Sequence, residues 1–149
     1  MERQLSLLCR VRDVLCALPL EHVEEVMRPL PVEPIAGAPS FVRGLAVVRG
    51  APTPIVDAAA LLHGAASRPT RFVSLKTGSR RTVLAVDAVV GVAELPPGSS
   101  GALPPLFEGA GSESIASVGA LDTELLLVVR SARLVPDEVW AAIEARDTQ

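Results

Sequence analysis

Side chains that could carry catalytic chemistry are few in this chain, and their spacing offers one candidate pair. The 149 residues include two histidines, two cysteines and no tyrosine. Cys16 precedes His22 closely, so a thiol paired with an imidazole is one hypothesis for a nucleophilic site. The other interpretation buries Cys16 in a strand and exposes His22 on a helix, and the sequence favours it. No P-loop, H-E-x-x-H or G-x-S-x-G motif occurs in the sequence.

Acidic and sulfur-bearing residues give no stronger candidate for a reactive site. Asp57 and Asp87 each follow an apolar run and would form a carboxylate pair if the chain had two symmetric halves, but their positions at strand ends favour capping or turn roles. Cys9 and Cys16 do not have the spacing of a zinc site, and we expect two free, mostly buried thiols. We therefore predict no catalytic residues, no metal and no cofactor.

The composition indicates a folded domain with an aliphatic core. Hydrophobic residues make up 49% of the chain and aromatic residues only 3%, so Val, Leu, Ala and Ile must fill the interior. The length fits a single domain over residues 1–149, with approximate halves at 1–66 and 67–135. A net charge of −3 and the scarcity of aromatic rings argue against nucleic-acid binding. No segment has the length and apolar character for membrane insertion, and no signal peptide is recognisable, so we expect a cytoplasmic protein.

Short strands at hairpin spacing dominate the chain. The pattern predicts about nine or ten strands and two or three short helices, which is typical of β-barrels or a sandwich. Val23, Val26 and Met27 have helical spacing and support a helix near residue 20. The predicted strands cover residues 5–10, 14–18, 41–48, 54–56, 71–77, 82–86, 87–92, 114–120 and 124–130; the predicted helices cover 19–26, 57–64 and 136–146, with a turn at 78–81 and a long loop at 96–111.

Residues 40–57 form the centre of this pattern. Two strand-like runs flank Arg49-Gly50, where the glycine can adopt a positive φ and so permits a tight turn. Pro52 and Pro54 lack amide donors, so the second run fits a sheet edge or a strand start better than the centre of a sheet. Arg49 is then either a solvated turn residue or a rigid surface residue that binds a partner.

The same stretch, with segments on both sides of it, resembles the CheW-like domain family. Residues 44–50, Gly-Leu-Ala-Val-Val-Arg-Gly, followed by residues 54–57, Pro-Ile-Val-Asp, are similar to the family signature. Residues 14–26, 83–89 and 117–130 resemble its opening segment, a later Val-Asp strand and its last hairpin. Val47-Val48 stand where the family has Asn-Leu, which removes a side chain that could hydrogen-bond the corner at Arg49.

The resemblance implies both a fold and a function. The implied fold is mainly β, with two small SH3-like five-stranded β-barrels packed around a shared aliphatic core and with short helices. The implied function is a non-catalytic scaffold that links the signalling tips of methyl-accepting chemoreceptors to the regulatory domain of a CheA-type histidine kinase, at receptor arrays on the inner face of the membrane. The positions that match the family's partner-binding residues are Val23, Glu25, Gly44, Arg49 and Gly50.

Each of these positions also has a purely structural interpretation. Val23 fits core packing, Glu25 a solvated face, and Gly44 a packing or bulge position. A CheW-like scaffold of a kinase pathway outside chemotaxis is the nearer alternative function. A small thiol enzyme that uses Cys16 and His22 is the more distant one.

Overall fold

The computed structural model describes residues 4–65, 68–95, 115–121 and 124–147. The predicted loop at 96–111 lies outside these residues. The strands in the described part are β1 (Gln4–Val11), β2 (Val14–Pro19), β3 (Val23–Met27), β4 (Val42–Val48), β5 (Ala51–Asp57), β6 (Arg71–Thr77), β7 (Arg80–Val86), β8 (Ala88–Leu95), β9 (Ile115–Leu121) and β10 (Glu124–Val129). The α-helices are α1 (Ala58–His63) and α2 (Asp137–Asp147), and single 3-10 turns are η1 (Leu20–His22) and η4 (Ser131–Arg133).

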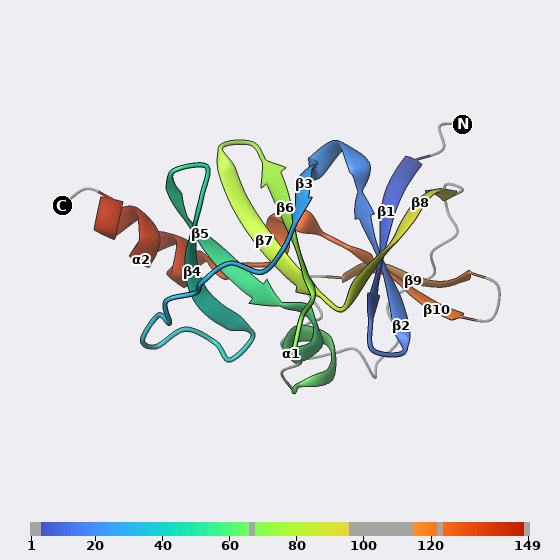
Figure 1. The fold of residues 1–149 in the computed structure, drawn as a ribbon, viewed down its shortest axis with the longest axis horizontal. Helices are drawn as coiled ribbons and strands as arrows, with labels where there is room; N and C mark the ends of the chain where they lie inside the picture. The colour runs from blue at the N-terminus through green and yellow to red at the C-terminus, as the bar shows by residue number, and fades with distance from the viewer. Residues whose placement is uncertain (1–3, 66–67, 96–114, 122–123, 148–149) are drawn as a thin grey trace.

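The strands form two five-stranded sheets that lie next to each other along the long axis of the molecule (Figure 1). Sheet A has the order β8-β1-β2-β10-β9, and sheet B has the order β3-β6-β7-β5-β4. Each sheet contains one parallel pair, β2 with β10 and β5 with β7. The predicted mainly β fold with two five-stranded units is confirmed. In the described residues no strand ladder joins the two edge strands of either sheet, so the sheets are not closed.

The two halves of the chain have the same succession of strands, but each half contributes to both sheets. Strands β1–β5 and β6–β10 each consist of a hairpin, a single strand and a second hairpin. Sheet A combines the first hairpin of the first half with the last three strands of the second half, and sheet B makes the reverse combination. The division predicted at residues 66 and 67 falls between β5 and β6, where it separates the halves but not the sheets. The single-domain extent stays a prediction.

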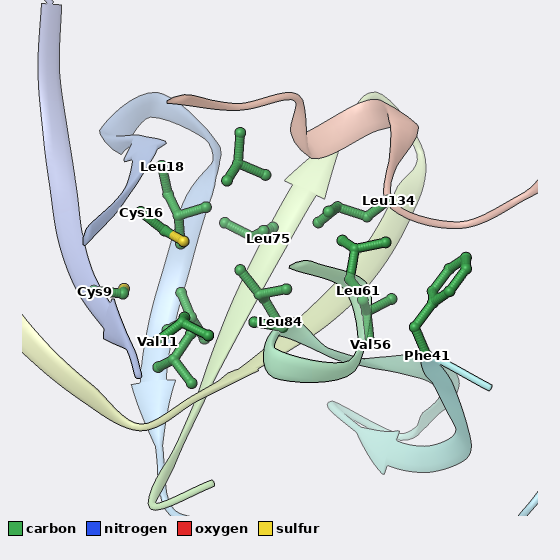
Figure 2. Close-up of a cluster of buried hydrophobic side chains, with 14 of the residues drawn as sticks. Cys9, Val11, Cys16, Leu18, Phe41, Val56, Leu61, Leu75, Leu84 and Leu134 are labelled. Carbon is green, nitrogen blue, oxygen red and sulfur yellow. The ribbon is translucent and has the colours of Figure 1, made fainter. Parts of the chain in front are cut away.

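Buried apolar side chains form one large and two small clusters. One small cluster belongs to sheet A and includes Leu8 and Leu15, and the other belongs to sheet B and includes Ile55 and Phe72. The large cluster takes side chains from both sheets and both α-helices. Figure 2 shows part of it: Cys9, Val11, Cys16, Leu18, Phe41, Val56, Leu61, Leu75, Leu84 and Leu134. The predicted shared aliphatic core is therefore confirmed.

The helix and turn signals at the end of β5 and β7 have the predicted roles. Asp57 caps α1, because its Oδ1 accepts a hydrogen bond of 3.2 Å from the amide of Ala60. Gly64 ends the helix with φ of +75°. Asp87 Oδ2 accepts a hydrogen bond of 2.7 Å from the amide of Arg12 at the β1–β2 turn. The two aspartates thus bind different partners, and their roles are capping and turn stabilisation.

Residues 19–26 do not form the predicted helix. After the single turn η1, the chain continues as β3, the edge strand of sheet B, which pairs with β6. The register passes from Val23 to Glu25 against consecutive residues of β6, so Glu24 is the extra residue of a β-bulge just before Glu25, which opposes Ser74. The bulge adds one residue to the alternation of a strand. For this reason the apolar residues of β3 acquire a spacing that also fits a helix.

The run that contains Pro52 and Pro54 lies inside sheet B. It belongs to β5, which pairs with β4 on one side and with β7 on the other. Pairing with β7 begins only at Ile55, beyond both prolines. The first half of the strand therefore has a ladder partner on the β4 side alone, and the strand-start position predicted for the prolines is correct.

Candidate functional site

Four of the five predicted partner-binding positions lie at one end of sheet B. Val23 and Glu25 belong to β3, and Arg49 and Gly50 form the turn between β4 and β5. Although β3 and β4 are opposite edges of the sheet, Arg49 Nε lies 3.4 Å from Glu25 Oε1 and 3.9 Å from Glu24 Oε2. The sheet is therefore curled, and ion pairs link two edges that the strand ladder leaves apart.

The turn that carries Arg49 has an unusual backbone conformation. Arg49 has φ of +51° and Gly50 has φ of +78°. Positive φ at both central residues is the geometry of a type I′ hairpin turn, whose twist matches that of the paired strands. Gly50 adopts it freely, whereas Arg49 does so against steric repulsion from its Cβ. The chain thus accepts local strain at the position where it places a guanidinium whose side chain is 53% exposed.

Arg81 of β7 holds the Glu24 carboxylate more firmly. Arg81 donates from Nε to Oε1 and from Nη2 to Oε2, the second bond being 3.2 Å long. The hydrogen bond from Arg81 is the largest cause and lowers the pKa of Glu24 below its ordinary value of 4.5. Burial, the next cause, raises the pKa, and the charges of Arg81, Arg49 and Lys76 lower it further. Glu24 is consequently an ionised, firmly held member of the site at neutral pH.

The strand register places Glu25, Lys76 and Arg81 on one face of sheet B, and ion pairs bring Glu24 and Arg49 to them. Lys76 pairs with Arg81 across the β6–β7 ladder, and Ser74, two positions before Lys76, opposes Glu25. Residues paired across strands share a face, as do residues two apart along a strand. We call Glu24, Glu25, Arg49, Lys76 and Arg81 the charged rim. Ser74 is the first buried residue below the charged rim.

Exposed valines lie next to the charged rim in the sequence. Val26 follows Glu25 on β3 and is 42% exposed, and Val47 precedes the Arg49 turn and is 70% exposed. Val23 is half-buried and packs against the shared core, so the core-packing interpretation accounts for part of its side chain. Val26 pairs with Val73 and so lies on the opposite face of β3 from Glu25, and the two valines are exposed apolar area on the strands that flank the charged rim.

Gly44, the fifth predicted position, has a packing role. The segment that contains Glu33 crosses β4 here, and Glu33 and Leu45 exchange two backbone hydrogen bonds of 2.8 Å. A Cβ on Gly44 would lie 1.9 Å from the carbonyl oxygen of Glu33. The register also shifts between Val42 and Gly44, as it does at a bulge. The packing or bulge interpretation is confirmed, while partner contact at all five positions stays a prediction.

Sequence reasoning missed Glu24 and Arg81. It assigned Glu24 to the polar side of a helix and Arg81 to a turn, whereas the turn is Gly78-Ser79 and Arg81 is a strand residue. A signal was present, because an acidic pair near the start of one apolar run and a basic pair at the start of another are complementary in charge. The signal needs the correct assignment of β3 as a strand before it can be used.

The thiol–imidazole hypothesis finds no support in the geometry of the two side chains. Cys16 lies directly opposite Cys9 in the β1–β2 ladder, and both thiols are free and fully buried, as predicted. Burial raises the pKa of Cys16 to about 12, with smaller contributions from Cys9 and Asp87, so the thiol stays neutral and unreactive. His22 Nδ1 instead lies 3.3 Å from Ser131 Oγ.

A metal site and a membrane-spanning helix find no support in the described part of the chain. Its His, Cys, Asp and Glu side chains nowhere gather in a group of three or more that could hold a metal ion. No helix described here has both the length and the apolar character to cross a membrane. The charged rim is therefore the candidate on which a functional argument can rest.

The fold and the site define a class of molecule first: a small β-rich protein with two open sheets and a charged surface site at the end of one of them. The model of the CheW-like domain matches residues 6–139, and the chain belongs to the CheW-like domain family. The fold is similar to that in the crystal structure of scaffolding protein TtCheW from Thermoanaerobacter tengcongensis, with a TM-score of 0.73 and 18% identity over 87% of this chain and 86% of that one. No curated protein sequence gives a significant match to the chain.

Proposed function

We propose that this protein is a non-catalytic adaptor that couples chemoreceptors to a CheA-type histidine kinase in chemosensory signalling. The match to the CheW-like domain over residues 6–139 is the observation that carries this proposal. The similarly folded TtCheW is a scaffolding protein, which supports the same kind of role. The protein would then act in the cytoplasm, at receptor arrays on the inner face of the membrane.

The charged rim, together with the exposed valines of β3 and β4, is the surface that we assign to a partner. Val26 and Val47 offer apolar contact area, and Glu25 and Arg49 offer opposite charges that can set the register of the partner. The signalling tip of a methyl-accepting chemoreceptor is the partner we favour here. A helix with one apolar stripe and charged residues beside it would match both features. The regulatory domain of the kinase is the second partner implied by family membership.

The assignment is tested by replacing Arg49 and measuring binding by calorimetry. We expect Arg49→Ala to weaken binding of the receptor fragment or of the kinase regulatory domain by roughly 1 to 3 kcal/mol, the range of an interface arginine. Arg10→Ala is the matched control, because Arg10 forms an ion pair of 2.9 Å with Glu124 on sheet A. Unchanged binding by a folded Arg49→Ala protein would remove Arg49 from the interface.

A pull-down from the native cell lysate, read by mass spectrometry, tests the function itself. Recovery of a histidine kinase together with chemoreceptors is the expected result. Recovery of a kinase without receptors would favour the alternative, a scaffold in a kinase pathway outside chemotaxis. Recovery of neither by a folded sample would contradict both proposals and leave only the family fold.

A further inference from the structure

One buried hydroxyl group beneath the charged rim has no hydrogen-bond partner. Ser74 lies in the middle of β6 with an exposure of 0%, and its Oγ is unpartnered. A hydroxyl buried without a partner loses its hydrogen bonds to water and gains none in return, so it lowers the stability of the fold. Native proteins contain few such groups, and each calls for an explanation.

The β-bulge brings two carboxylates to this hydroxyl. Glu25 opposes Ser74 on the neighbouring strand, and Glu24 is the extra residue between the pairs at Val23 and Glu25. Glu24 is occupied by Arg81, which donates two hydrogen bonds to it. Glu25 has a weaker hold, because its ion pair is the 3.4 Å contact with Arg49 and its side chain is 41% exposed. Opposed residues have Cβ atoms about 5 Å apart, a distance that a glutamate side chain can span.

We propose that Ser74 is a second binding position for the Glu25 carboxylate, used when a partner takes Arg49. In the free protein, Glu25 pairs with Arg49 and the Ser74 hydroxyl is unpartnered. An acidic side chain of the partner that binds Arg49 repels Glu25, which turns inward and accepts a hydrogen bond from Ser74 Oγ. When Glu25 loses its ion pair with Arg49, it gains the hydrogen bond from Ser74. The exchange therefore lowers the free-energy cost of breaking that ion pair.

Cationic side chains lie on the face of sheet B to which Glu25 would turn. Lys76 and Arg81 lie on the same face of sheet B as Ser74, so positive charge is present near the path of Glu25. Glu24 stays bound to Arg81 throughout, so the charge of Arg81 offsets the repulsion that Glu24 would exert on an inward Glu25. The inference rests on the proposed function for the partner's identity, but the exchange of Glu25 between Arg49 and Ser74 is a property of the isolated chain.

A double-mutant cycle in the isolated protein tests the exchange without any partner. Ser74→Ala removes the unpartnered hydroxyl, and in the otherwise native protein it should raise the thermal midpoint by about 2 to 4 °C. Arg49→Gln releases Glu25 to Ser74, so in that background Ser74→Ala should give no rise or a fall. An equal rise in both backgrounds overturns the proposal.

Three further variants serve as controls for the double-mutant cycle. Arg49→Gly also removes the guanidinium and suits the positive φ of residue 49, so it serves if the Gln variant folds poorly. In an Arg10→Gln background, which breaks an ion pair on sheet A, Ser74→Ala should keep its full rise. In a Glu25→Ala, Arg49→Gly background the rise should return, and its absence would contradict the role of Glu25. The cycle can fail while Arg49→Ala still weakens partner binding. It can also succeed while Arg49→Ala leaves partner binding unchanged, so the two proposals can be tested separately.

Discussion

Sheets A and B have the same arrangement of strands but different ion pairs. In both sheets a hairpin lies between an edge strand and a parallel neighbour, and a second hairpin completes the other edge. Sheet B carries the charged rim, which links β3 to the β4–β5 turn and to β7. In sheet A, Arg10 and Glu124 form an exposed pair of 2.9 Å between β1 and β10. Since one strand arrangement forms with either set of charges, the charged rim is not required by the fold.

Gly44→Ala has the largest expected effect, because it should destabilise sheet B without touching sheet A. A Cβ at residue 44 cannot fit against the backbone of Glu33, so the crossing segment must shift away from β4. We expect the free energy of unfolding, measured with urea, to fall by about 3 kcal/mol. Gly50→Ala is the control: residue 50 also has a positive φ but nothing within 4 Å, and its loss should be about 1 kcal/mol. Equal losses would mean that the crossing is not tight.

The substitutions Arg81→Gln and Arg10→Gln compare how much an ion pair contributes to stability in each of the two sheets. Arg81 and Glu24 are each 19% exposed, so removal of the arginine leaves a poorly hydrated carboxylate on the charged rim. We expect a loss of about 1 kcal/mol in the free energy of unfolding. Arg10→Gln removes a pair whose side chains are 36% and 41% exposed, and it should cost almost nothing because water and salt screen it. A larger loss for Arg10→Gln would reverse the comparison.

The smallest expected effect is a dependence of the free energy of unfolding on pH, which arises from Glu24 in sheet B. The pKa of Glu24 is lowered in the folded protein, chiefly by the hydrogen bond from Arg81, so the unfolded chain binds the proton more tightly. The contribution of Glu24 is therefore complete above its ordinary pKa of 4.5 and is lost as the pH falls from there through the folded value. Urea midpoints measured between neutral and acid pH should fall less steeply for Glu24→Gln than for the native protein. Parallel profiles would show that Glu24 gains nothing from Arg81.

The sequence predicts most of the fold because most of its signals are local. Alternating apolar residues and the Arg49-Gly50 corner define strands and a hairpin, and Asp57 with Gly64 delimits a helix. The error at β3 has a physical cause, since the bulge at Glu24 disturbs the alternation by which a strand is recognised. The strand-start prediction for Pro52 and Pro54 is correct, because the parallel neighbour β7 pairs with β5 only from Ile55 onward.

The candidate site is predicted only in part, because its contacts are not local. Arg49, Gly50 and Glu25 follow from the resemblance to the CheW-like family, whose signature contains the corner. The pairing of Glu24 with Arg81 joins residues 57 positions apart, and it depends on the curl of sheet B and on the bulge. Neither feature can be deduced from the spacing of residues along a single strand.

The interleaving of the two halves determines the order in which a growing chain can complete its sheets. The β1–β2 hairpin is synthesised first, yet its neighbours β8 and β10 come from the second half, where Leu126 lies opposite Leu15. All five strands of sheet B, by contrast, are present once Val86 has been made. The first hairpin to leave the ribosome is therefore among the last to gain its partners, and its unpaired edges stay open to chaperones or to aggregation during that interval.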